Sequence, residues 1–118
     1  MLYTNLKHIE SASQFANIIA DYENVTIICG KMDPASVSMY RIAESLQTKF
    51  THVGFFDMES DNPEARVIHH LPEVQHLNTV PVMVCFKNGE VACVQSGIQT
   101  KAQVMSAMEH VFSTTIIA

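Results

Sequence analysis

One stretch of the chain decides the fold: it reads VPVMVCFKNGE and runs from Val80 to Glu90. Its run of β-branched and other apolar residues predicts a strand over 82–87. Asn88 and Gly89 follow, and Asn-Gly is the preferred pair for a two-residue hairpin turn. We therefore predict a hairpin whose second strand covers 90–95.

The same turn predicts how the two hairpin cysteines relate to each other. Counting back from a two-residue turn pairs Cys85 with Ala92, one position short of Cys93. Because side chains alternate along a strand, we expect Cys85 and Cys93 to point to opposite faces and to form no disulfide. With Cys29 the chain has three cysteines, an odd number without metal-ligand spacing. We expect all three to be buried free thiols that act as small hydrophobes.

Upstream of the hairpin, strand and helix patterns alternate. The stretch Val25–Cys29 is apolar without alternation, as expected for a strand buried on both faces. The expected strands cover 2–9, 25–30 and 53–58. Four helices are expected: one after Ser11, one from Asp33 to Phe50, one that starts at Pro63, and one from Thr100 to Phe112. At 118 residues, this order predicts one α/β domain over residues 1–118.

The Thr-Val-Pro and Phe-Lys-Asn-Gly signatures, at 79–81 and 86–89, resemble those of the thioredoxin superfamily. The order of elements is similar as well, and the likeness spans nearly the whole chain. The resemblance implies a thioredoxin-like fold: a central mixed sheet of four to five strands, flanked by helices on both faces.

The resemblance also implies that the usual catalytic dithiol is missing. Aligned without gaps from the end of the second helix, the family's Cys-x-x-Cys motif falls on Asp33, Pro34, Ala35 and Ser36, and the family's buried acid falls on Ile27. A carboxylate cannot attack a disulfide, because that step needs a thiolate. Asp33 and Pro34 also suit a helix start in their own right, as N-cap and first helical residue.

A second alignment places the motif on Cys29–Met32 and keeps one cysteine. It lengthens the second helix by about one turn and still lacks a resolving cysteine. In this alternative the chain is a monothiol oxidoreductase acting through Cys29. That activity requires an exposed thiol with a lowered pKa, and Lys31 is the only nearby cation to lower it.

Val80 and Pro81 are the other functional positions that the resemblance implies. In the family, the corresponding X-Pro bond is cis, abuts the active-site helix, and lies beside backbone that pairs with an extended peptide, a form of strand addition. We expect a partner-binding surface at Met32, Asp33, Pro34, Val80 and Pro81. The alternative is that Pro81 serves only the turn.

Two classes of function remain. The first is a redox-inactive adaptor that binds a protein partner or a second copy of itself; the second is the monothiol enzyme. Lys and Arg number 7 against 12 Asp and Glu, a net charge of −5, which argues against nucleic acid and anionic membranes. The first ten residues lack signal-peptide features, so we expect an intracellular, cytoplasmic protein. We expect no cofactor and no small-molecule substrate.

The segment His69–Asn78 is longer than thioredoxins usually have, and it carries three histidines. We interpret it as an exposed polar loop. The alternative, a metal site, would need a fixed cluster of convergent ligands, and adjacent histidines on a helix point in different directions.

Overall fold

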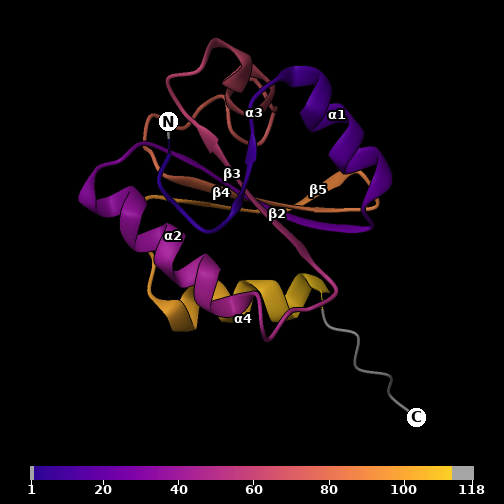
Figure 1. Ribbon diagram of the computed structural model, residues 1–118, viewed down its shortest axis with the longest axis vertical. Coiled ribbons are helices and arrows are strands. Elements are labelled where there is room, and N and C mark those ends of the chain that lie inside the picture. The colour runs from indigo at the N-terminus through magenta and orange to yellow at the C-terminus, as the bar shows by residue number, and fades with distance from the viewer. Residues whose placement is uncertain (1, 113–118) are drawn as a thin grey trace.

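A computed structural model describes residues 2–112 of the chain. The elements follow in the order β1 (Lys7–Ile9), α1 (Ala12–Asp21), β2 (Asn24–Gly30), α2 (Pro34–Leu46), β3 (Gly54–Glu59), a 3-10 turn (Pro63–Ala65), α3 (Arg66–His69), β4 (Val82–Lys87), β5 (Glu90–Ser96) and α4 (Lys101–Phe112). The fold is α/β and thioredoxin-like, as predicted from the sequence (Figure 1).

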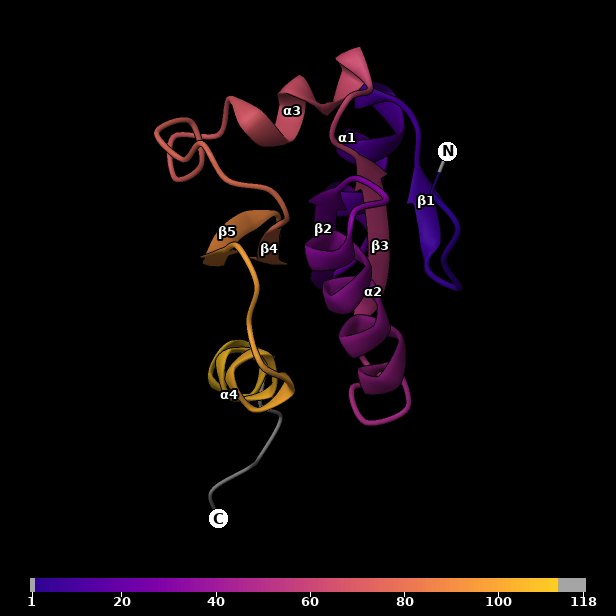
Figure 2. The ribbon, with the colours of Figure 1, turned by 90° about the vertical axis from the view of Figure 1, so that its left-hand side faces the viewer.

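The five strands form one mixed sheet in the order β1-β3-β2-β4-β5. Strands β1, β3 and β2 run parallel, and β4 and β5 are antiparallel to their neighbours. Helices α1 and α3 cover one face of the sheet, and α2 and α4 cover the other (Figures 1 and 2). Each face has its own core, because neighbouring residues of the central strand point opposite ways. Ile27 belongs to the α1 side and Ile28 to the α2 side.

Two predicted elements are shorter than expected. The first strand was predicted over 2–9, but only Lys7–Ile9 pairs with β3. The preceding residues instead hydrogen-bond to side chains, for example the Asn5 N–H to Glu44 Oε2 at 2.6 Å. The second helix ends at Leu46, and turns continue to Phe50, whose N–H donates to the Leu46 carbonyl at 2.9 Å.

The predicted cysteine register is wrong. A β-bulge between Cys85 and Phe86 shifts the pairing by one residue, so that Cys85 lies directly opposite Cys93. A bulge places two residues of one strand opposite one of the other, which the counting from the turn did not include. The two cysteines therefore share the α4 face of the sheet. All three cysteines are free in the structure; Cys29 and Cys85 are buried, whereas Cys93 is only half-buried.

The segment between α3 and β4 is packed against the sheet, in contrast to the predicted exposed loop. Val74 is buried, and Leu71 and Leu77 contact the core on the α1 side. His70 and His76 are exposed, as a polar loop would be. The apolar residues at 71, 74 and 77 therefore anchor the segment. No helix within residues 2–112 has the length and apolar character that crossing a membrane requires.

Candidate functional site

The N-terminus of α2 is built around a carboxylate. Asp33 is the N-cap, as predicted, and its Oδ1 accepts a hydrogen bond from the Ser36 N–H at 2.9 Å. Pro34 occupies the first helical turn, where its missing N–H costs nothing. Hydrogen bonds from the Ser36 hydroxyl and N–H hold the pKa of Asp33 below its usual value. A fixed negative charge therefore lies where the helix dipole is most favourable to an anion.

Ser36 is fully buried beneath this helix start. Its Oγ accepts a hydrogen bond from the Lys31 N–H at 3.1 Å, and the Tyr40 hydroxyl donates to the Lys31 carbonyl at 2.8 Å. The backbone at Gly30 approaches both side chains closely, since a Cβ there would lie 2.7 Å from Ser36 Oγ and 2.8 Å from the Tyr40 hydroxyl. These contacts hold the link between β2 and α2 in one geometry.

The chain leading into β4 lies beside this link. Cys29 pairs with Val82 in the antiparallel ladder, so the residues after Cys29 run next to those before Val82. The Val80–Pro81 peptide bond is cis. Figure 2 shows the start of α2 next to β4, the strand that follows the cis bond.

The five residues predicted to bind a partner do not contribute equally to this surface. Met32 is 43% exposed, Pro34 is exposed, and Asp33 and Val80 are partly exposed. Pro81 is buried, and its carbonyl accepts a hydrogen bond from the Gly97 N–H at 2.7 Å. Pro81 therefore lies below this surface, and the binding role of the five residues stays a prediction. No hydrogen bond within residues 2–112 engages the backbone of Val80.

Two exposed apolar side chains that the sequence did not single out extend this surface. Tyr3 is 71% exposed, and its N–H lies 3.5 Å from Met32 Sδ. Ile98 is 62% exposed and follows Gly97, whose N–H donates a hydrogen bond to the Pro81 carbonyl. Only tertiary structure places them here, because Tyr3 is far from Met32 in sequence and Ile98 is far from Pro81.

Cys29 does not meet the requirements of an attacking thiol. It is fully buried, and burial raises the pKa of its thiol to about 12. Its Sγ lies 3.9 Å from His69 Nε2, which also lies 3.1 Å from Ser60 Oγ. A thiol with this pKa is almost entirely protonated at neutral pH.

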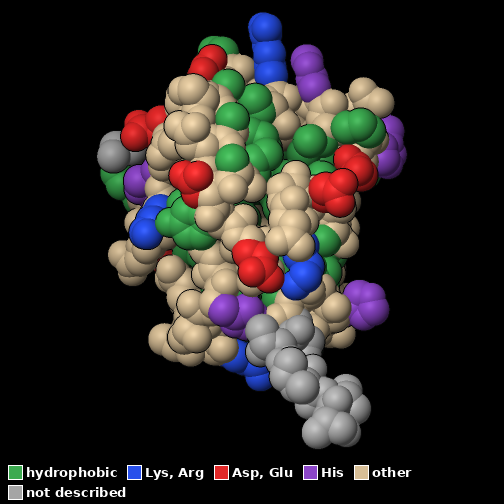
Figure 3. All heavy atoms as spheres, turned by 90° about the vertical axis from the view of Figure 1, so that its right-hand side faces the viewer, with side chains coloured by type: hydrophobic (Ala, Val, Ile, Leu, Met, Phe, Trp, Pro, Cys, Tyr) green, Lys and Arg blue, Asp and Glu red, His purple; other side chains and the backbone are tan. Residues whose placement is uncertain are grey.

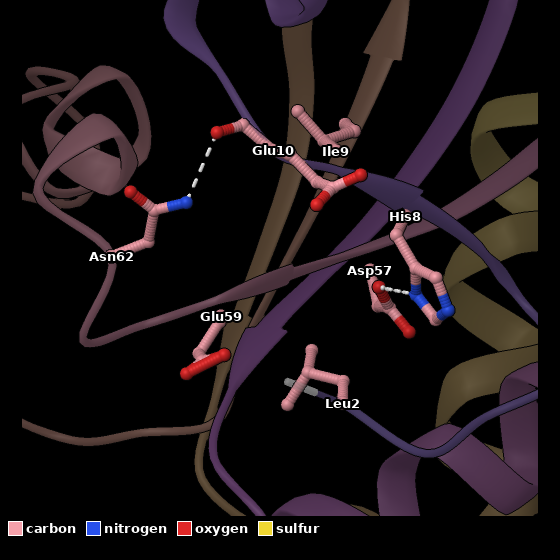
Figure 4. Close-up of a pocket in the computed structure, with 7 residues that line it drawn as sticks. All are labelled: Leu2, His8, Ile9, Glu10, Asp57, Glu59 and Asn62. Carbon is pink, nitrogen blue, oxygen red and sulfur yellow. Dashed lines mark hydrogen bonds and ion pairs between the residues drawn. The ribbon is translucent and has the colours of Figure 1, made fainter.

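A second polar site was missed in the sequence analysis. Asp57 on β3 is fully buried; its Oδ2 accepts a hydrogen bond from the Thr4 hydroxyl at 2.5 Å, and its Oδ1 lies 2.6 Å from His8 Nδ1. Burial raises the pKa of the Asp57 carboxyl. Figure 4 shows this pair beside a cavity of about 310 Å³ that Glu10 and Glu59 also line. The available signal was an acidic residue in the middle of an apolar strand.

Neither a metal-ligand cluster among residues 2–112 nor a basic patch on the face shown in Figure 3 is found. No group of three His, Cys, Asp or Glu side chains within residues 2–112 is arranged to hold a metal ion. On the side of the molecule opposite the α2 N-terminus, Lys and Arg side chains lie apart from one another among acidic and apolar ones (Figure 3).

Comparisons with known proteins show which solved structures have a similar fold. No protein-family model matches the sequence, and no curated protein matches it either. Among solved structures, thioredoxin from Plasmodium falciparum is 18% identical, with a TM-score of 0.73 over 89% of this chain and 99% of that one. Chlamydomonas reinhardtii thioredoxin f2 is 10% identical, with a TM-score of 0.77 over 94% of this chain and 100% of that one.

A chain from a structural study of yeast mitochondrial 1-Cys peroxiredoxin and its glutathione and thioredoxin systems is 19% identical. Its TM-score is 0.75 over 93% of this chain and 99% of that one. At these identities the likeness concerns the fold alone. The chain has a thioredoxin-like fold along almost its whole length.

Proposed function

We propose that this chain is a redox-inactive thioredoxin-like adaptor that binds a protein partner at the surface formed by Met32, Asp33, Pro34 and Val80. One observation supports the proposal above all: a carboxylate caps the helix at which a thioredoxin dithiol would stand. The exposed apolar side chains around it provide contact area for a partner.

The mode of binding that we propose is strand addition. Val80 has a backbone without hydrogen bonds to residues 2–112, so its N–H and carbonyl are available to an extended peptide. The partner's side chains would contact Met32 on one side and Ile98 on the other. A second copy of this chain is the alternative occupant.

The alternative function, a monothiol enzyme acting through Cys29, finds less support. Its thiol would need to be exposed and ionised, whereas Cys29 is buried and has a raised pKa.

The first test concerns catalysis. We expect no dithiothreitol-driven reduction of insulin above background, because no thiol pair stands at the α2 N-terminus. The double variant Asp33→Cys, Ser36→Cys should form a disulfide on oxidation and gain some activity, with Ile27 leaving proton transfer poor. Wild-type turnover comparable to that of an ordinary thioredoxin would refute the proposal.

The second test concerns binding. Val80→Glu places a charge beside Met32 and should remove the partner from co-purification in the native cell, measured by quantitative mass spectrometry. Ala16→Glu on an exposed position of α1 adds the same charge elsewhere and is the matched control. Equal recovery of the partner with wild type and both variants would show that this surface is not the binding site.

A further inference from the structure

The bulged hairpin brings two thiols together at a place unrelated to the α2 N-terminus. Cys85 on β4 and Cys93 on β5 are direct partners across an antiparallel pair. Residues opposite each other in such a pair have Cα atoms about 4.5–5.5 Å apart, which lies within the range of about 4.4–6.8 Å seen in disulfides. The spacing of such a pair is therefore compatible with a disulfide.

The environments of the two thiols differ in a way that assigns them different roles. Cys85 is fully buried, and its Sγ lies 3.6 Å from Thr26 Oγ1. Cys93 is half-buried and lies on β5, which is an edge strand of the sheet. A hydrogen bond from Cys85 lowers the pKa of Cys93 to about 7, and the same interaction raises that of Cys85. Cys93 is thus the partly exposed thiol that ionises more readily, whereas Cys85 is the buried thiol paired with it.

The surroundings of Cys93 favour a small polar molecule as the oxidant over another protein. Gln95 lies two residues along the same strand and on the same face as Cys93, and its Oε1 is buried without a hydrogen-bond partner among the described residues. It also lines a hollow between β5 and α4. The Cα atoms of Gln95 and Cys93 lie about 7 Å apart along the strand, and an amide oxygen accepts a hydrogen bond from an O–H donor such as a hydroperoxide.

We propose that Cys93 and Cys85 are a peroxide-oxidised thiol pair that closes to a reversible cross-strand disulfide. The Cys93 thiolate attacks one oxygen of hydrogen peroxide: an S–O bond forms, the O–O bond breaks, and the leaving hydroxide takes a proton to become water. The Cys85 sulfur then attacks Cys93 Sγ. The S–S bond forms, the S–O bond breaks, and the hydroxide leaves as a second water with the Cys85 proton.

Two thiols lose two electrons in total, and the peroxide gains them. A small dithiol such as dithiothreitol reverses the reaction. This chemistry is stoichiometric and involves a half-buried sulfur, so it is compatible with the absence of insulin reduction proposed above.

The positions of lysine and arginine make the disulfide easy to map. Trypsin places each cysteine in its own peptide: Cys29 in 8–31, Cys85 in 67–87 and Cys93 in 88–101. We would treat the folded full-length protein with hydrogen peroxide, block remaining thiols with N-ethylmaleimide, digest, and analyse the peptides by mass spectrometry. We expect peptides 67–87 and 88–101 to be joined, with a protein mass lower by two hydrogens, and peptide 8–31 to carry the maleimide.

Variants separate the steps. Cys85→Ser should stop the reaction at a Cys93 sulfenic acid that dimedone traps, whereas Cys93→Ser should abolish both the cross-link and the dimedone adduct. Cys29→Ala is the matched control and should leave the cross-link intact. If that control fails to fold, the wild-type peptide map decides alone, since no two cysteines share a peptide.

Several results would overturn the proposal. One is a native protein in which peroxide leaves both hairpin thiols free, and another is over-oxidation of Cys93 without cross-linking. A third is a native protein in which disulfides to Cys29 form as often as they do in urea-unfolded protein. None of these results bears on partner binding at Val80, so this proposal and the proposed function can fail separately.

Discussion

Two buried or capping carboxylates show how one residue type can have opposite effects on stability. Hydrogen bonds from Ser36 lower the pKa of Asp33, so the folded state favours the ionised form of its carboxyl. Burial raises the pKa of Asp57, so the folded state favours its protonated form. Ionised Asp33 therefore supports the fold, whereas ionisation of Asp57 opposes it as the pH rises through its folded pKa.

The role of Asp33 can be tested by mutation and pH together. Asp33→Ala should lower the urea midpoint at neutral pH, because α2 loses its cap. On acidification the unfolded chain takes up the Asp33 proton first, since the folded pKa is lower. The difference in urea midpoint between wild type and Asp33→Ala is therefore largest above the unfolded pKa of about 3.9. It shrinks as the pH falls through the folded pKa of Asp33.

Asp33→Asn is the matched control for this experiment. Asparagine keeps the capping oxygen without the charge, so its midpoint should lie between those of wild type and alanine and should show no such change with pH. An alanine variant that is as stable as wild type at neutral pH would contradict the capping role.

At the scale of elements, the segment before β1 is held to the sheet by polar contacts. The Thr4 hydroxyl donates to buried Asp57 and accepts from the Leu6 N–H at 3.0 Å. It joins the N-terminal segment to β3, two parts of the chain more than fifty residues apart in sequence.

Replacing this hydroxyl should weaken the whole N-terminal edge. Thr4→Val keeps the shape but leaves Asp57 Oδ2 without its donor, and we expect the free energy of unfolding to fall by about 1–3 kcal/mol. Thr4→Ser retains the hydroxyl, so its free energy of unfolding should fall clearly less than that of Thr4→Val. Chemical denaturation at neutral pH measures both variants, and a Thr4→Val variant as stable as wild type would show that the hydroxyl does not stabilise the fold.

At the scale of the whole molecule, one sheet supports two cores. Ile27 and Ile28 are neighbours in sequence, are each almost completely buried, and belong to different cores. If residues 1–118 form one domain, both cores should unfold together.

The pair Ile27→Val and Ile28→Val tests this cooperativity. Each substitution should lower the free energy of unfolding by about 0.5–1.5 kcal/mol, and the double variant should lose about the sum, since the two side chains share no core. Circular dichroism and aromatic absorbance should report a single common transition in all three variants. Separate transitions by the two probes would indicate two independently folding units.

Local sequence signals were sufficient for much of the architecture. Asn88-Gly89 predicted the hairpin, and the Asp33-Pro34 pair predicted where α2 begins. Both signals depend on backbone preferences of the residues themselves. The alternation of strand and helix patterns predicted the fold class for the same reason.

Tertiary structure alone decided which side chains meet. The bulge that sets Cys85 against Cys93 depends on how β5 pairs along its whole length, and counting from the turn cannot detect it. The burial of Asp57 depends on the N-terminal segment that covers it, and the contact of Tyr3 with Met32 joins parts of the chain that no local pattern relates. Local preferences act over a few residues, whereas a site is defined by distances in space, and the packing of the whole chain sets those distances.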